Sequence, residues 1–152
     1  MALIEIENLT YTYPLTESPA LRDINLSVQP GEFIGIIGPD GSGRSTLAYT
    51  LAGFIPHFYK GTLQGSVRID GANTADTPLD QLVLKVGLAF QNPFNQISGA
   101  KYSVYEEIAF GLENIGTPPA EMPARIEEVM RLTGIRHLAE RSPYSLSGGQ
   151  QQ

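Results

Sequence analysis

The sequence contains no cysteine and only two histidines among its 152 residues. The absence of thiols excludes a disulfide framework, a thiolate zinc site, an iron–sulfur cluster and a cysteine nucleophile. Two imidazoles also leave little room for a histidine metal site. A chain of this length buries about 68 to 70% of its unfolded surface on folding, so it can hold a core without such crosslinks.

Positive charge and long apolar segments are scarce as well. Ten Lys and Arg residues against sixteen Asp and Glu residues give a net charge of −6. Because sequence-independent binding of nucleic acid depends on positive charge, this net charge disfavours it. No apolar stretch approaches the roughly 20 residues of a membrane-spanning helix, and residues 1–5 lack the features of a secretion signal. These absences predict a soluble cytoplasmic protein without a nucleic-acid partner.

Apolar and polar residues alternate in residues 4–7, 24–29 and 63–69. A period of two residues is typical of antiparallel strands that have one solvated face. Two further runs, residues 33–37 and 86–90, are apolar almost throughout. Because such runs are typical of strands buried on both faces, we expect them to form a covered, largely parallel sheet.

The chain from residue 93 onward has helical spacing instead. Ser103 and Glu106 are spaced as a capping box, and four apolar residues of one helical face follow: Val104, Ile108, Leu112 and Ile115. A second helix is expected over residues 120–133, stopped by Gly134. Its inward residues are predicted to be Ile126, Val129 and Met130.

A glycine-rich turn separates the first apolar run from the helical pattern that begins at Ser45. It consists of Gly38, Pro39, Asp40, Gly41, Ser42, Gly43, Arg44, Ser45 and Thr46. Glycines allow successive backbone N–H groups to converge on phosphate oxygens, and the helix N-terminus adds a positive dipole end. The turn matches the Walker A phosphate loop, in which Lys reaches the β- and γ-phosphates and Ser or Thr ligates Mg²⁺.

One position of this phosphate loop departs from the pattern, because Arg44 stands where Lys is expected. The guanidinium is a bulky planar fork, whereas the ammonium of lysine is a slender point charge. We therefore expect weakened ATP binding. An ordinary glycine turn is the alternative interpretation, and the preceding apolar run and following helix disfavour it.

A second motif, Leu146-Ser147-Gly148-Gly149-Gln150, lies near the other end of the chain. With both motifs, the chain resembles the ATP-binding cassette ATPases over its whole length. In this resemblance Tyr13 matches the aromatic residue that stacks on adenine, and Gln91 matches the Q-loop glutamine. The implied fold is α/β, a P-loop NTPase with a RecA-like core and an antiparallel β subdomain (residues 1–92) followed by a helical subdomain (residues 93–152).

The resemblance also implies a composite site for ATP and Mg²⁺ between two cassettes arranged head to tail. Residues 38–46 would bind phosphates, Ser45 and Gln91 would ligate Mg²⁺, and Gln91 would sense the γ-phosphate and water. Across the interface, the partner's nucleotide would meet Ser147, Gly148, Gly149 and Gln150. The implied partners are a second ATPase subunit or domain and an integral-membrane transporter subunit, which would hold the protein on the inner face of the membrane.

Residues 91–97 and 106–114 resemble those of energy-coupling-factor ATPases, which drive uptake of vitamins and of transition-metal ions such as cobalt. Residues 53–59 resemble the first half of the tandem-cassette members. The implied function is therefore the coupling of ATP binding and hydrolysis to import.

The sequence ends at Gln152, directly after the signature motif and before the family's catalytic Glu and switch His. We therefore expect an amino-terminal portion of a cassette, with no catalytic residue inside the chain. One alternative is a catalytically inactive truncated cassette that serves as a nucleotide-binding or interaction module. Another is a P-loop protein outside transport, such as a DNA-repair or translation ATPase, which the acidic charge and residues 91–93 disfavour.

Overall fold

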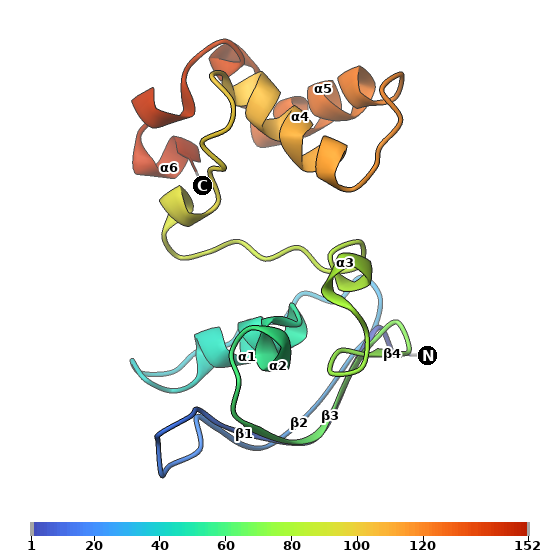
Figure 1. The fold of residues 1–152 in the computed structure, drawn as a ribbon, viewed down its shortest axis with the longest axis vertical. Coiled ribbons are helices and arrows are strands. Elements are labelled where there is room, and N and C mark those ends of the chain that lie inside the picture. Colours follow the sequence, from blue (N-terminus) through green and yellow to red (C-terminus); the bar gives the residue numbers. More distant parts are fainter. Residues whose placement is uncertain (1, 152) are drawn as a thin grey trace. The chain divides into compact units, whose positions relative to one another are not determined.

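The computed structural model describes residues 2–151 (Figure 1). The chain divides into two compact units, Met1–Leu88 and Ala89–Gln152. The first unit is mixed α/β and the second is helical. Within the described residues, no helix combines the length and the apolar composition needed to cross a membrane.

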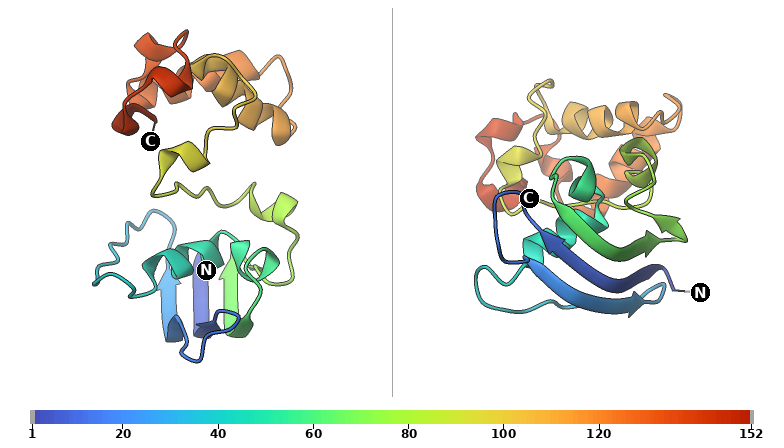
Figure 2. Two further views of the ribbon diagram at one scale, coloured as in Figure 1. Left: turned by 60° about the vertical axis from the view of Figure 1, so that its left-hand side comes forward. Right: turned by 60° about the horizontal axis from the view of Figure 1, so that its bottom comes forward.

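The first unit is built on a four-stranded antiparallel sheet with the order β2-β1-β3-β4 (Figure 2). The strands are β1 (Ile4–Thr12), β2 (Leu21–Val28), β3 (Thr62–Ile69) and β4 (Ala72–Asn73). Ile6 of β1 lies opposite Leu26 of β2 and Val67 of β3. The structure thus confirms the antiparallel strands predicted from the alternating segments.

Three helices complete the first unit: α1 (Arg44–Leu51), α2 (Phe54–His57) and α3 (Leu79–Leu82). Leu47 of α1 and Ile55 of α2 are buried in one core cluster with Ile6, Leu9 and Val67 of the sheet. This shared apolar core fixes α1, and with it the phosphate loop that leads into α1, on the sheet.

The two apolar runs differ from their prediction. Residues 33–37 and 86–90 have no strand structure, and Phe33 and Ile37 are 97% and 95% exposed. A strand requires a neighbour for its backbone N–H and C=O groups, and no strand of the described sheet pairs with either run. The prediction of two buried parallel strands is therefore wrong for the described residues.

The second unit contains α4 (Val104–Asn114), α5 (Met122–Thr133), α6 (Gly148–Gln151) and the short 3-10 helices η1 (Pro93–Asn95), η2 (Arg136–Leu138) and η3 (Pro143–Ser145). Its core cluster consists of Val104, Ile126, Met130 and Leu138. Both predicted helices are confirmed, and Gly134 caps α5.

Three details of these helices differ from the sequence pattern: the approximate start of α5 and the burial of two apolar residues. Helix α5 begins at Met122 with Pro123 in its first turn, because proline is preorganised for that position and donates no N–H. Val129, which was predicted to face inward, and Ile115, which was predicted to share the apolar face of α4, are both exposed. Ile115 is the C-terminal cap of α4, where the helical spacing that would bury it has ended.

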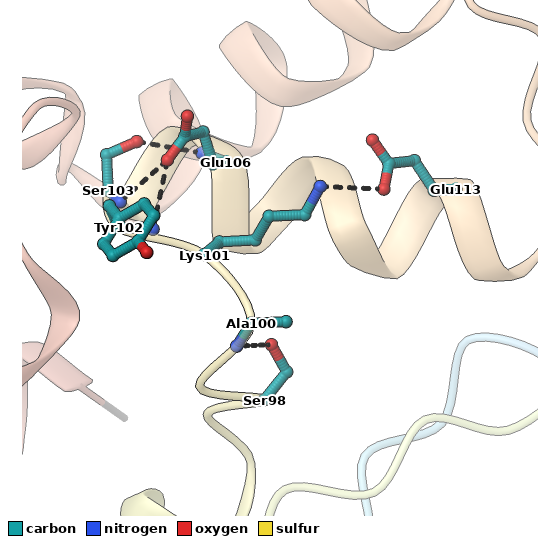
Figure 3. A network of polar contacts seen from close by, with 7 residues as sticks. All are labelled: Ser98, Ala100, Lys101, Tyr102, Ser103, Glu106 and Glu113. Carbon is teal, nitrogen blue, oxygen red and sulfur yellow. Dashed lines mark hydrogen bonds and ion pairs between the residues drawn. The ribbon is translucent and has the colours of Figure 1, made fainter.

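The capping box of α4 forms as its sequence predicts (Figure 3). The Ser103 hydroxyl accepts from the Glu106 N–H at 3.2 Å. In return, Oε2 of Glu106 accepts from the N–H groups of Ser103 and Tyr102, each at 3.1 Å. These hydrogen bonds stabilise the charged carboxylate, and the bond from the Tyr102 N–H has the largest effect, followed by those with Ser103. They therefore hold the pKa of Glu106 below its ordinary value of 4.5.

We expect acid to loosen the first turn of α4. Because the folded pKa of Glu106 lies below the unfolded value, the carboxylate stabilises the folded chain above pH 4.5, and this contribution is lost as the pH falls through the folded pKa. NMR chemical shifts of residues 103–107 during an acid titration measure this effect.

The matched variant for this titration is Glu106→Gln, which keeps a capping-box side chain and removes the titrating group. Its first turn should lack the acid-dependent change, whereas Glu128→Gln on α5 should retain it. An unchanged acid response in Glu106→Gln would show that another carboxyl group is responsible.

Candidate nucleotide-binding site

The phosphate loop enters α1 through Gly43, which has a left-handed φ of 87° and serves as a helix cap without a side-chain hydrogen bond. The Leu47 N–H donates to the Gly43 carbonyl at 2.9 Å. The N–H groups of the first helical turn have no carbonyl inside the helix, and they lie at the positive end of its dipole. This end of α1 therefore suits an anion.

Two of the three loop glycines, Gly38 and Gly43, occupy positions where a side chain would not fit. A Cβ on Gly43 would lie 2.5 Å from the Ala20 carbonyl oxygen, and one on Gly38 would lie 2.7 Å from Oγ of Ser42. Because Gly38, Gly41 and Gly43 carry no side chain, phosphate oxygens can approach the backbone N–H groups of the loop at these positions. These residues fit the phosphates of a nucleotide.

The two hydroxyl residues of the first turn of α1 differ in their surroundings. Thr46 is buried, and its Oγ1 lies 3.2 Å from the Tyr13 hydroxyl oxygen. Ser45 is exposed, so its hydroxyl is accessible to a ligand. Because Mg²⁺ prefers oxygen ligands, Ser45 fits the predicted metal role better than Thr46.

Tyr13 belongs to an aromatic cluster next to α1. Its ring contacts Tyr11 edge to face with centroids 4.8 Å apart, and lies 6.3 Å from the Tyr59 ring. The hydrogen bond to Thr46 was not predicted, since residues 13 and 46 are far apart in sequence. The structure thus brings Tyr13 to the helix of the phosphate loop, while adenine stacking stays a prediction.

Arg44 turns back over its own loop. Nη1 donates to the Gly38 carbonyl, and Nη2 donates to Oδ1 of Asp40 at 3.2 Å. The sequence analysis included Asp40 among the nucleotide-binding residues but did not predict this ion pair. The spacing of four residues between opposite charges at a helix start was the signal available for it.

A cavity of about 130 Å³ lies beside the loop. Leu21 and Leu47 contribute apolar walls, and Ser42 and Arg44 contribute polar groups. Sites that enclose a whole organic ligand usually measure about 300 to 1,000 Å³. The cavity is therefore too small to enclose an entire nucleotide.

The family model described as ABC transporter matches residues 21–152. The chain belongs to the ABC transporter family. The match includes both the phosphate loop and the signature motif at residues 146–150. The resemblance stated from these motifs is thereby confirmed, as is the P-loop α/β fold of this family.

Curated ABC transporter proteins resemble the chain along its whole length. A Pyrococcus abyssi protein named as an ABC transporter ATP-binding protein is 45% identical over 100% of this chain and 54% of its own length. The energy-coupling factor transporter ATP-binding protein EcfA1 of Lacticaseibacillus paracasei is 41% identical over 99% of this chain and 51% of its own length. The chain thus spans about half the length of these two relatives.

Solved structures of ABC ATPases agree with the fold. The structure of cbiO1 from Clostridium perfringens, described as part of the ABC transporter complex cbiONQ, has a TM-score of 0.80 and 30% identity, covering 99% of this chain and 57% of that one. The ATP-binding cassette MJ0796, solved as a dimer bound to ADP and Pi, has a TM-score of 0.77 and 31% identity, covering 97% and 65%.

The remaining predicted site residues of this ABC chain lie in the second unit. Gln91 is exposed at a bend just before η1. Residues 147–150 are exposed at the start of α6, where Oε1 of Gln150 accepts from the Ser147 N–H at 3.0 Å. The signature motif is therefore locally ordered and open to solvent.

Proposed function

We propose that the protein is an ATP-binding subunit of an ABC importer of the energy-coupling-factor type, which couples ATP binding and hydrolysis to uptake of a vitamin or transition-metal ion. The observation that carries the nucleotide part is the glycine-rich loop of residues 38–46, which leads through the left-handed Gly43 into the N-terminus of α1. The names EcfA1 and cbiO1 support the importer class.

In this proposal the residues near the loop have distinct roles in binding nucleotide and Mg²⁺. The N–H groups of residues 41–46 bind the phosphates, Arg44 adds positive charge, and Ser45 supplies an oxygen to Mg²⁺. Tyr13 stacks on adenine from its place beside Thr46, whereas a Mg²⁺-binding role of Gln91 stays a prediction from the family resemblance. Bound Mg²⁺ would neutralise phosphate charge during hydrolysis.

The proposed partners are a second ATPase subunit or domain and an integral-membrane transporter subunit. The exposed signature residues Ser147, Gly148, Gly149 and Gln150 would face the nucleotide of the second cassette. The MJ0796 dimer and the cbiONQ complex named for two similar structures support this assembly. It would hold the protein on the cytoplasmic face of the membrane.

A nucleotide-binding module without turnover is the second candidate. The observation that favours it is the engagement of Arg44 with Gly38 and Asp40, because an arginine held this way does not point its charge at a γ-phosphate. Co-purification with a tagged copy from the natural host, followed by ATPase assays on the recovered membrane complex, distinguishes the two. Turnover supports the transport ATPase, and nucleotide binding without turnover supports the module.

Replacing Arg44 by lysine should tighten Mg-ATP binding. A slender ammonium can extend along the loop as a point charge, and one charge-assisted hydrogen bond gained corresponds to roughly a tenfold change in Kd. Isothermal titration of the unaltered protein and of Arg44→Lys measures this change.

The matched control is Arg125→Lys, because Arg125 of α5 pairs with Glu121, the residue just before that helix, in the other unit. It should leave the Kd unchanged. Equal affinity in the unaltered protein and in Arg44→Lys would contradict the expectation that arginine weakens binding at this position. A complete lack of Mg-ATP binding in both would contradict the proposed function itself.

A further inference from the structure

Arg44 carries the only positively charged side chain in residues 38–46. Its guanidinium donates hydrogen bonds to oxygen atoms of the same segment. The Gly38 carbonyl accepts from Nη1 of Arg44, and the Asp40 carboxylate accepts from Nη2 at 3.2 Å. A guanidinium has five N–H donors arranged in a fixed plane. Donors that point at the loop's own oxygens must be redirected before they can bind phosphate oxygens.

We propose that Asp40 is a determinant of nucleotide affinity that acts through Arg44, holding the guanidinium back from the phosphates. This inference rests on the proposed nucleotide-binding function and concerns the regulation of that site. A phosphate group competes with Asp40 for the same donors.

The position of Asp40 indicates that its side chain is not needed for folding, so its effect on nucleotide affinity can be tested by substitution. Its side chain is fully exposed, and the helix cap of α1 is Gly43. Replacement by asparagine keeps the size of the side chain and removes the charge. The fold of the first unit should therefore tolerate the substitution.

The expected effect of Asp40→Asn is Mg-ATP binding about three- to fivefold tighter, because exposed ion pairs of this kind shift equilibria by up to about fivefold. Inorganic tripolyphosphate is the second probe. Since the competition concerns phosphate oxygens alone, its affinity should rise by the same factor. Circular dichroism should show unchanged secondary structure.

Two comparisons distinguish the proposed route from a general charge effect. Asp76→Asn removes the same charge from an exposed turn in the same unit and should change the Kd by less than about twofold. In an Arg44→Gln background, where no guanidinium remains to be released, Asp40→Asn should also give less than about a twofold gain.

The outcomes are separable. If the unaltered protein binds Mg-ATP and Asp40→Asn binds it no tighter, this inference is wrong while the proposed function stands. An equal gain from Asp76→Asn, or an undiminished gain in the Arg44→Gln background, also overturns it, because the effect would then not pass through Arg44. If none of the proteins, Arg44→Lys included, binds either probe, the proposed function and this inference both fail.

Discussion

Replacing Gly43 by alanine is expected to destabilise the first unit by about 2 to 4 kcal/mol and to abolish nucleotide binding. Gly43 has a φ of 87°, a left-handed conformation that costs an L-residue about 1 to 2 kcal/mol. The added Cβ would also lie 2.5 Å from the Ala20 carbonyl oxygen and 3.0 Å from Cδ2 of Leu21. Backbone cannot move away cheaply, so the phosphate loop must shift.

The chain offers a matched control for this substitution in Gly41. Gly41 has a similar φ of 78°, but a Cβ there would have no atom within 4 Å. Gly41→Ala should therefore cost only the conformational strain, about 1 kcal/mol. Urea unfolding of both variants, followed by hydrogen exchange in β1 and β2, measures the difference. Equal losses of unfolding free energy in Gly43→Ala and Gly41→Ala would show that the close contact of the added Cβ with the Ala20 carbonyl does not affect stability.

Replacing Ile126 by alanine should destabilise the second unit by about 2 to 4 kcal/mol. Ile126 is 1% exposed and lies in a single core cluster with Val104, Met130 and Leu138. The other apolar residues packed against this cluster are only partly buried, so truncation of Ile126 removes one of the few fully buried side chains and leaves a cavity in the core. We expect the substitution to raise hydrogen-exchange rates throughout α4 and α5.

The control for the Ile126 substitution is Leu132→Ala on the same helix. Leu132 is 67% exposed, so its truncation should change stability by no more than about 0.5 kcal/mol. Hydrogen exchange is the appropriate measurement, because a chain of two units need not unfold in one step. Similar protection in the two variants would mean that the cluster around Ile126 does not hold the unit together.

Local patterns were predicted well from the sequence. The capping box of Ser103 and Glu106 depends on residues three apart, and the stop at Gly134 depends on its own backbone. The alternation in β1 and β2 likewise reports which face is buried. Such features depend on neighbours along the chain, so the sequence contains the necessary information.

The failed predictions concern neighbours in space. Residues 33–37 and 86–90 are apolar enough for buried strands, yet burial requires pairing strands and covering helices, which composition cannot guarantee. Val129 shows the same limit on a smaller scale. It has the spacing of an inward residue, but only the packing of α5 decides which apolar positions contact the core.

The sequence by itself determined the family and the residues of the phosphate loop and signature motif, because these motifs specify backbone freedom, charge and hydroxyl groups at fixed spacing. Only the tertiary structure decided which groups those residues contact. The approach of Tyr13 to Thr46 depends on how β1 and α1 pack. The hold of Gly38 and Asp40 on Arg44 depends on the path of the loop, because hydrogen bonds form between groups that the fold brings within reach.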